Sequence, residues 1–116
     1  MTQVIYKICR KAEWRKATDT GTYQGSPDDL RDGFIHFSCA DQLAVTLAKH
    51  FSRQRDLVLI SVATAKLGNL LKWEKSRGGQ LFPHLYGRLD VNLAISVQPI
   101  SLGENGHKLP DLEAGK

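Results

Sequence analysis

Two short segments hold the residues best suited to chemistry. One is GFIHFS at residues 33–38 and the other is FPHLYG at residues 82–87. An imidazole donates or accepts a hydrogen bond and exchanges its proton near neutral pH. The hydroxyl groups of Ser38 and Tyr86 add further hydrogen-bonding partners. We therefore predict a polar pocket built on these two segments.

The first segment has the pattern of a short strand that leads into a helix. Because alternate side chains of a strand share a face, Phe34, His36 and Ser38 should point the same way. If Ser38 caps the following helix, the free amides of that helix, the hydroxyl and the imidazole could together bind an anion. The alternative is that Ser38 is only a cap and that His36 is a satisfied, partly buried residue.

The second segment and a nearby glutamate offer a complementary set of groups. In an extended chain, His84 and Tyr86 share a face and provide a hydrogen-bonding ring and a stacking ring. Glu74, next to an indole, could act as a general base or accept hydrogen bonds from ribose hydroxyls. The alternatives are a turn held by the tyrosine hydroxyl and a histidine cap, and a solvated glutamate between Lys72 and Lys75.

Several common classes of site lack their motifs. The sequence contains no GxSxG, Walker A or GxGxxG pattern, which excludes the commonest hydrolase, phosphate-loop and Rossmann sites. His36 and His84 with Glu74 or Cys39 could form a metal site, but the spacing typical of paired metal ligands is absent, so we expect no metal. Cys9 and Cys39 are expected to be reduced.

The chain of 116 residues has the length of one domain, which we expect to span residues 1–102, with a loosely ordered C-terminal tail over residues 103–116. The net charge of +4 favours a small anionic or nucleotide-like ligand. No apolar run approaches the ~20 residues that span a bilayer, and the start lacks the pattern of a signal peptide. We therefore expect a cytoplasmic protein with no membrane partner.

The predicted elements alternate irregularly between strands and helices, which indicates the α+β class. Hydrophobic patterning and turn residues predict strands at 4–9, 34–38, 57–62, 72–75 and 92–97. Helices are predicted at 11–18 and from about 39 to 51, with a helical turn at 27–30 capped by Ser26. Pro99 is expected to end the last strand because it lacks an N–H group.

Taken together, these features resemble the domain of unknown function 952 family, a group of small, mostly bacterial proteins. The resemblance covers about residues 3 to 98. It rests on the first strand, Trp14 with Ala17, Gly21, Tyr23, residues 33–38 with Gln42, Trp73 with Glu74, and residues 82–87.

The resemblance implies a fold similar to that of ADP-ribosyltransferases and RNA 2′-phosphotransferases, with a split mixed β-sheet, short helices and NAD as the cofactor. It implies catalytic roles for His36, which would hold a nicotinamide ribose, and for Glu74. The ligand-binding residues would be Ser38, His84, Tyr86, Tyr23 and Trp14. An RNA or a protein would be the acceptor.

Three functions are compatible with these residues. The first is an NAD-using transferase, and the second is a non-catalytic module that binds a small anionic or phosphorylated ligand. The third is a structural or partner-binding domain in which the histidines are packing residues.

Overall fold

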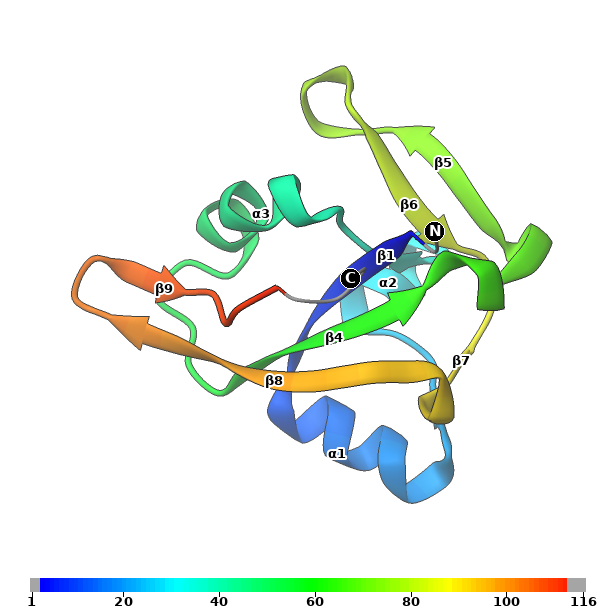
Figure 1. The fold of residues 1–116 in the computed structure, drawn as a ribbon, viewed down its shortest axis with the longest axis horizontal. Helices are drawn as coiled ribbons and strands as arrows, with labels where there is room; N and C mark the ends of the chain where they lie inside the picture. The colour runs from blue at the N-terminus through cyan, green and yellow to red at the C-terminus, as the bar shows by residue number, and fades with distance from the viewer. Residues whose placement is uncertain (1–2, 113–116) are drawn as a thin grey trace.

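A four-stranded antiparallel sheet forms the centre of the protein. The structure is a computed structural model and describes residues 3–112. The sheet has the order β1-β4-β8-β9 (Figure 1). Its strands are β1 (Val4–Arg10), β4 (Leu57–Ala63), β8 (Ala94–Gly103) and β9 (Gly106–Lys108). The first six residues of β4 are all buried, so both faces of the sheet are covered at this strand.

A second sheet of three strands has the order β3-β6-β5. Its strands are β3 (Ile35–His36), β5 (Leu71–Lys75) and β6 (Leu81–Leu85). The β5–β6 hairpin extends from the body of the protein at the upper right of Figure 1. A single bridge between Ser38 and Tyr6 ties the end of β3 to β1, so the two sheets meet there. A small third sheet pairs β2 (Thr22–Tyr23) with β7 (Leu89–Asp90).

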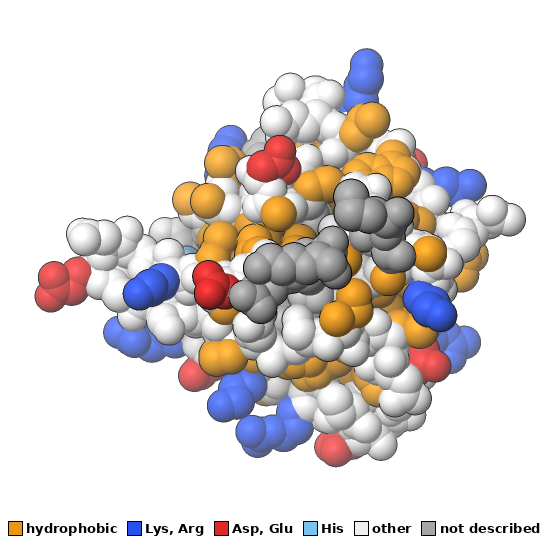
Figure 2. Space-filling view, viewed as in Figure 1, with side chains coloured by type: hydrophobic (Ala, Val, Ile, Leu, Met, Phe, Trp, Pro, Cys, Tyr) orange, Lys and Arg blue, Asp and Glu red, His pale blue; other side chains and the backbone are white. Residues whose placement is uncertain are grey.

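The helices are short and pack on both sides of the central sheet. They are α1 (Lys11–Thr20), α2 (Pro27–Asp32) and α3 (Leu43–His50). Trp14 and Ala17 of α1 enter one core cluster with β1 and β4, and Leu43 and Leu47 of α3 enter a second. Among residues 3–112, no helix is both long and apolar enough to cross a membrane. Lys and Arg side chains lie along the lower left edge of the face in Figure 2, over α1 and the start of β4.

Within residues 3–112, five short 3-10 turns connect these elements. They lie at Ala40–Gln42, Thr64–Lys66, Gly68–Leu70, Arg77–Gly79 and Val91–Leu93. The expected strands near 4–9, 57–62 and 72–75 and the helix near 11–18 are confirmed, each within two residues at its ends.

The prediction of a mixed sheet is wrong, because every strand pair in the described residues is antiparallel. The continuous apolar run of β4 reflects burial on both faces, which is usual for parallel strands. Here the same burial arises because core clusters on the α1 and α3 sides cover an antiparallel sheet.

Pro99 does not end the strand predicted at 92–97. This strand, β8, continues to Gly103 and pairs Pro99 with Val58. On its other side, β8 pairs with β9 only at residues 101–103. Pro99 therefore lies where one edge of β8 is free, and proline is tolerated at such an edge because no partner needs its missing N–H.

Ser38 does not cap the helix that follows it. Its backbone N–H donates to the carbonyl of Tyr6 at 2.8 Å, so the residue remains strand-like. The chain then makes the 3-10 turn at 40–42, in which Gln42 Oε1 accepts a hydrogen bond from the Cys39 N–H at 2.9 Å. The regular helix α3 begins only at Leu43.

Much of the expected C-terminal tail is structured. Residues 106–108 form β9, and Leu109 and Leu112 pack against the core cluster that includes α3. The expectation of a loosely ordered tail therefore does not hold for residues 103–112. Residues 113–116 lie outside the described residues.

Candidate functional site

The two histidine segments meet at their histidines. His36 of β3 and His84 of β6 are opposite each other across the antiparallel pair, with ring centroids 5.4 Å apart. The ring of Phe34 stacks on His84 with a centroid distance of 4.1 Å and lies 4.5 Å from His36. Strand register therefore brings together two imidazoles that are 48 positions apart in the chain.

His36 is held by the buried carboxylate of Asp29, and we call these two residues the inner pair. Asp29 Oδ1 lies 2.6 Å from His36 Nδ1, and Asp29 Oδ2 lies 2.8 Å from Lys7 Nζ. The Asp29 side chain is only 1% exposed and that of Lys7 5%. Because a carboxylate only accepts hydrogen bonds, Nδ1 of His36 must carry the proton that it donates.

Local sequence places Asp29 at the start of α2. The N–H of Asp29 donates to Ser26 Oγ at 3.2 Å, and Asp29 Oδ2 accepts from the N–H of Ser26 at 2.9 Å, which completes a capping box. Pro27 suits the first helical position, where its lack of an N–H costs nothing. Gly33 ends α2 with a positive φ of 88°, a conformation that glycine adopts readily. The chain then turns directly into β3.

Opposing effects set the charge of Asp29. Burial raises the pKa of this carboxyl group, but the hydrogen bond from His36 and the charge of Lys7 outweigh it, so the pKa lies well below its ordinary value. Asp29 is therefore a carboxylate at neutral pH. On the other side of the imidazole, His36 Nε2 lies 3.1 Å from Asp32 Oδ2. His36 thus contacts a carboxylate at each ring nitrogen.

His84 is held by Glu74 of β5, and we call these residues the outer pair. Glu74 Oε1 lies 2.8 Å from His84 Nδ1 and accepts a hydrogen bond of 2.8 Å from the Tyr86 hydroxyl. The His84 side chain is 6% exposed, whereas that of Glu74 is 42% exposed. These hydrogen bonds lower the pKa of Glu74, and the bond to Glu74 raises the pKa of Tyr86.

The glycine that ends the second segment has a packing role. A Cβ atom at Gly87 would lie 2.9 Å from Leu70 Cδ1, and the N–H of Tyr86 donates to the carbonyl of Leu70 at 2.8 Å. The absence of a side chain at Gly87 therefore leaves room for the Leu70 side chain beside the end of the second segment.

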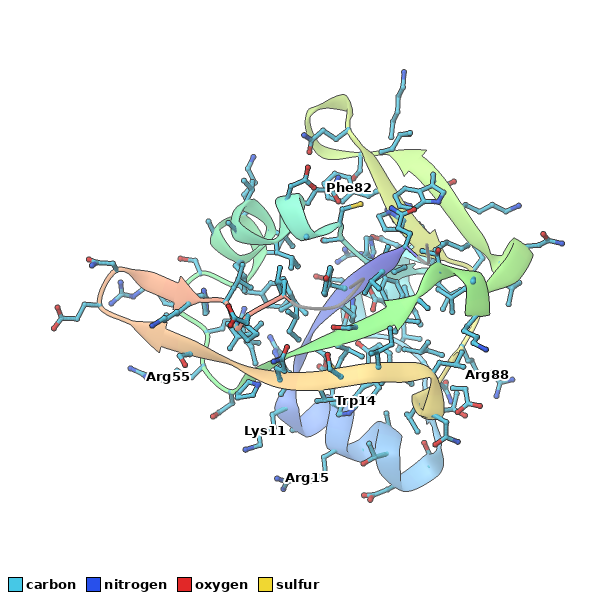
Figure 3. The ribbon with its side chains drawn as sticks, viewed as in Figure 1. Lys11, Trp14, Arg15, Arg55, Phe82 and Arg88 are labelled. Atoms are coloured by element: carbon cyan, nitrogen blue, oxygen red, sulfur yellow. The ribbon has the colours of Figure 1, made fainter. Side chains whose placement is uncertain are left out.

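A cavity of about 210 Å³, the histidine pocket, lies beside the inner pair. Side chains from β1, α2, the 35–38 segment, α3 and β6 line it, among them Lys7, Asp29, His36, Ser38, Phe82 and His84. Phe82, labelled in Figure 3, belongs to the β5–β6 hairpin and is one of the residues that line the pocket. Three of the predicted site residues thus line one cavity: His36, Ser38 and His84.

The other predicted residues lie at two different places. Glu74 and Tyr86 do not line the pocket. Glu74 is hydrogen-bonded to His84, which does line it, and Tyr86 is hydrogen-bonded to Glu74. Trp14 and Tyr23 are buried in the core, 7% and 2% exposed, with ring centroids 5.7 Å apart. Trp14 lies on α1, below the central sheet in Figure 3. The structure therefore does not bring these two rings to the histidine pocket.

Sequence reasoning missed Lys7, Asp29 and Asp32. Lys7 lies inside an otherwise apolar strand, and a buried lysine needs a charged partner. Asp29 stands three residues after Ser26, which is the spacing of a capping box. These two signals indicated an ion pair, but nothing in the sequence specified that the two residues are partners.

The two cysteines are free thiols in the structure. Burial raises the pKa of Cys9 to about 11 and raises the pKa of Cys39 as well. Both therefore stay protonated at neutral pH, a state in which a thiol is a poor nucleophile. Within residues 3–112, no three His, Cys, Asp or Glu side chains gather in a way that could hold a metal ion.

The two pairs differ in the chemistry open to them. When Nδ1 of a neutral histidine donates to a carboxylate, Nε2 is left as a hydrogen-bond acceptor or a base. His36 Nε2 already faces Asp32, so both of its nitrogens can donate only when the ring is protonated. The structure shows no such carboxylate at Nε2 of His84 among the described residues, so His84 is the better candidate to accept a proton.

These observations define the protein as a small single-domain α+β protein with curled antiparallel sheets, short helices and a histidine pocket where two sheets meet. The chain belongs to the family described as protein of unknown function (DUF952), whose family model matches residues 8–97. The resemblance noted from the two histidine segments is thereby confirmed.

Solved structures of one bacterial protein are similar to this chain. The crystal structure of protein CC0527 from Caulobacter crescentus is 47% identical, with a TM-score of 0.86, over 89% of this chain and 90% of that chain. The solution NMR structure of CC0527 is 46% identical, with a TM-score of 0.80, over 90% of each chain. A search of curated proteins gave no match.

Proposed function

We propose that the histidine pocket binds the nicotinamide riboside end of NAD, or a similar N-linked riboside, and that the protein is an ADP-ribosyltransferase-like enzyme. The observation that carries this proposal is the arrangement of the two histidines. Both imidazoles lie beside one small cavity, and each is oriented by a carboxylate on Nδ1.

The charges around the pocket favour a ligand rich in hydroxyl groups, or one that carries a positive charge, over a phosphate. Lys7 and Arg31, the two lysine and arginine side chains that line the described pocket, are already paired with aspartates. Carboxylates accept hydrogen bonds from ribose hydroxyls and stabilise positive charge. This charge pattern does not favour the hypothesis, suggested by the net charge, that the protein is a non-catalytic module that binds an anion.

The residues of the pocket and of the adjacent outer pair suit the chemistry that NAD would supply. When the bond between nicotinamide and ribose breaks, nicotinamide would leave with the bonding electron pair and the ribose would develop positive charge. Glu74 lies outside the cavity but is hydrogen-bonded to His84, and its partly exposed carboxylate would stabilise that charge from the edge of the pocket. Nε2 of His84 would take the proton from the attacking hydroxyl or amine of the acceptor. Tyr86, 39% exposed, offers a ring for stacking beside them. An RNA or a protein would provide the acceptor group.

The size of the cavity limits which part of the ligand it holds. About 210 Å³ is below the ~300 Å³ of typical ligand pockets. The pocket therefore suits one nucleoside-sized portion, and the remainder of a dinucleotide would lie outside it.

Binding is tested by NMR titration with nicotinamide riboside, with inorganic phosphate as the anionic comparison. We expect the riboside to shift backbone amide signals of the 33–38 and 82–87 segments, and phosphate to leave them in place. His84→Gln should weaken riboside binding by about tenfold, while Lys66→Gln, at an exposed position that does not line the pocket, should not change it. If phosphate shifts the same signals and the riboside does not, the proposal is wrong.

Catalysis is tested separately by measuring nicotinamide released from NAD in the presence of a bacterial cell extract. Release that depends on Glu74 and His84 would support a transferase. Riboside binding without any release would favour a non-catalytic binding module. That second candidate has one observation in its favour, namely that aspartates already occupy both nitrogens of His36.

A further inference from the structure

A second surface, which shares no lining residue with the histidine pocket, consists of two adjoining hollows. One, of about 1040 Å³, lies between α3 and the β8–β9 hairpin, and the other, of about 410 Å³, lies between the start of α1 and β8. Arg55 and Leu102 line both. We call the two hollows together the basic groove.

The cations of the basic groove are free. Lys11, Arg53 and Arg55 line it, and none has an ion pair within residues 3–112. Figure 3 shows Lys11 and Arg55 on the same side of the protein. Two carboxylates, on Asp56 and Glu104, also line the groove, but neither forms an ion pair with these cations. The groove therefore offers unpaired positive charge.

The loop that presents the two arginines is held firmly. The carbonyl of Gln54, which stands between them, accepts a hydrogen bond of 2.8 Å from His107 Nε2 of β9. The carbonyl of Asp56 accepts one of 2.7 Å from the N–H of Lys11. Anchors from two separate elements thus fix the loop on both sides of Arg55.

The backbone of this loop is unusual as well. Arg53 and Asp56 have φ values of 62° and 59°, and they are the two described non-glycine residues with positive φ. Glycine or asparagine adopts this left-handed conformation at lower cost than arginine. Strained backbone of this kind concentrates at functional sites, so the use of arginine at position 53 points to a need for its side chain.

The uncharged part of the groove mixes apolar and polar side chains and contains no aromatic hydrocarbon ring. Its apolar lining includes Leu47, Val97, Pro99, Leu102 and Leu109, its polar lining includes Ser52, Ser101 and Asn105, and no Phe, Tyr or Trp lines it. Single-stranded nucleic acid is usually bound through aromatic rings on which its bases stack. Apolar side chains beside free cations are complementary to a peptide that alternates apolar and acidic side chains.

We propose that the basic groove binds an acidic, apolar-containing peptide segment of a partner protein. The apolar side chains of the peptide would lie on the floor of the groove, and its carboxylates would pair with Lys11, Arg53 and Arg55. This interaction is independent of the riboside site, so either proposal can fail without the other.

Fluorescence anisotropy with a labelled peptide of alternating glutamate and leucine tests the proposal, with a lysine–leucine peptide and an oligouridylate of equal length for comparison. Arg53→Asn removes one charge and suits the left-handed backbone, so the variant should fold. With Arg55→Gln added, we expect binding of the acidic peptide to weaken about tenfold. Asp56→Asn, which also suits its backbone, should strengthen binding about twofold to threefold.

The matched control is Lys66→Asn, which removes an exposed charge outside the groove and should leave affinity unchanged. Circular dichroism of each variant verifies that the fold is retained. The proposal is overturned if the acidic peptide does not bind, or if Lys66→Asn weakens binding as much as the arginine changes do. It is also overturned if the oligouridylate binds more tightly through the same arginines, because the groove would then be a nucleic-acid site.

Discussion

The inner pair and the outer pair consist of the same two chemical groups, yet they stand in opposite surroundings. In the inner pair the carboxylate of Asp29 is 1% exposed and also caps α2 and neutralises Lys7. In the outer pair the side chain of Glu74 is 42% exposed, and its carboxylate is hydrogen-bonded to His84 and Tyr86. One carboxylate is buried within the fold, whereas the other is partly exposed to solvent.

The difference shows that the carboxylate that orients a histidine can either be part of the protein core or lie at the surface. A buried carboxylate with several donors keeps its imidazole in one orientation, because any loss leaves charges unpaired away from water. An exposed carboxylate can exchange its partners with water or ligand at little cost. We therefore expect the inner pair to position the site and the outer pair to take part in its chemistry.

The largest effect should come from removing the charge of the inner pair. Asp29→Asn leaves Lys7 buried without a counter-charge and weakens the hydrogen bonds to His36, so the free energy of unfolding should fall by about 3–5 kcal/mol. Urea denaturation followed by circular dichroism measures this change. The matched variant Glu74→Gln should lose far less stability. If the two variants lose equal free energy of unfolding, the proposed difference between the inner and outer pairs is wrong.

Low pH should also reduce the contribution of the inner pair to stability, but by less than Asp29→Asn does. Because the pKa of Asp29 in the folded protein lies below its ordinary value of 3.8, its stabilising contribution is present above about pH 4 and is lost as the pH falls through the folded pKa. We expect the free energy of unfolding to drop by about 1–2 kcal/mol between pH 4 and pH 2.

The control for this acid effect is the Asp29→Asn variant, which has no carboxyl group at position 29. Its urea midpoint should depend less on pH over the same interval than that of the parent protein. If both proteins lose stability in parallel, other carboxyl groups cause the acid sensitivity.

The smallest effect concerns the outer pair alone. The pKa of Tyr86 is raised chiefly by its hydrogen bond to the Glu74 carboxylate, so Glu74→Gln should lower that pKa toward its ordinary value. Ultraviolet titration of the phenol groups detects this shift. Burial also raises the pKa of Tyr6 and Tyr23, so a Tyr86→Phe variant is needed to identify the ionisation step that belongs to Tyr86. If Glu74→Gln leaves that step unchanged, the Tyr86–Glu74 hydrogen bond does not persist in solution.

Local patterns in the sequence were enough to predict most of the elements. The alternation of residues 4–9 and the apolar run of 57–62 predicted β1 and β4, and the Ser26–Pro27 pair predicted the start of α2. Predictions failed where a neighbouring strand decides the outcome. Pro99 is tolerated because one edge of β8 is free there, and Ser38 pairs with β1 instead of capping a helix.

The sequence by itself determined which groups were available: two histidine segments, a glutamate beside an indole, and a family likeness carried by those same residues. Only the tertiary structure decided how they are arranged. It set His36 opposite His84 across a strand pair, placed Trp14 and Tyr23 in the core, and joined Asp29 to Lys7. The physical reason is that motifs and periodicity depend on neighbours along the chain, whereas strand register and buried charge pairing depend on residues brought together from distant positions.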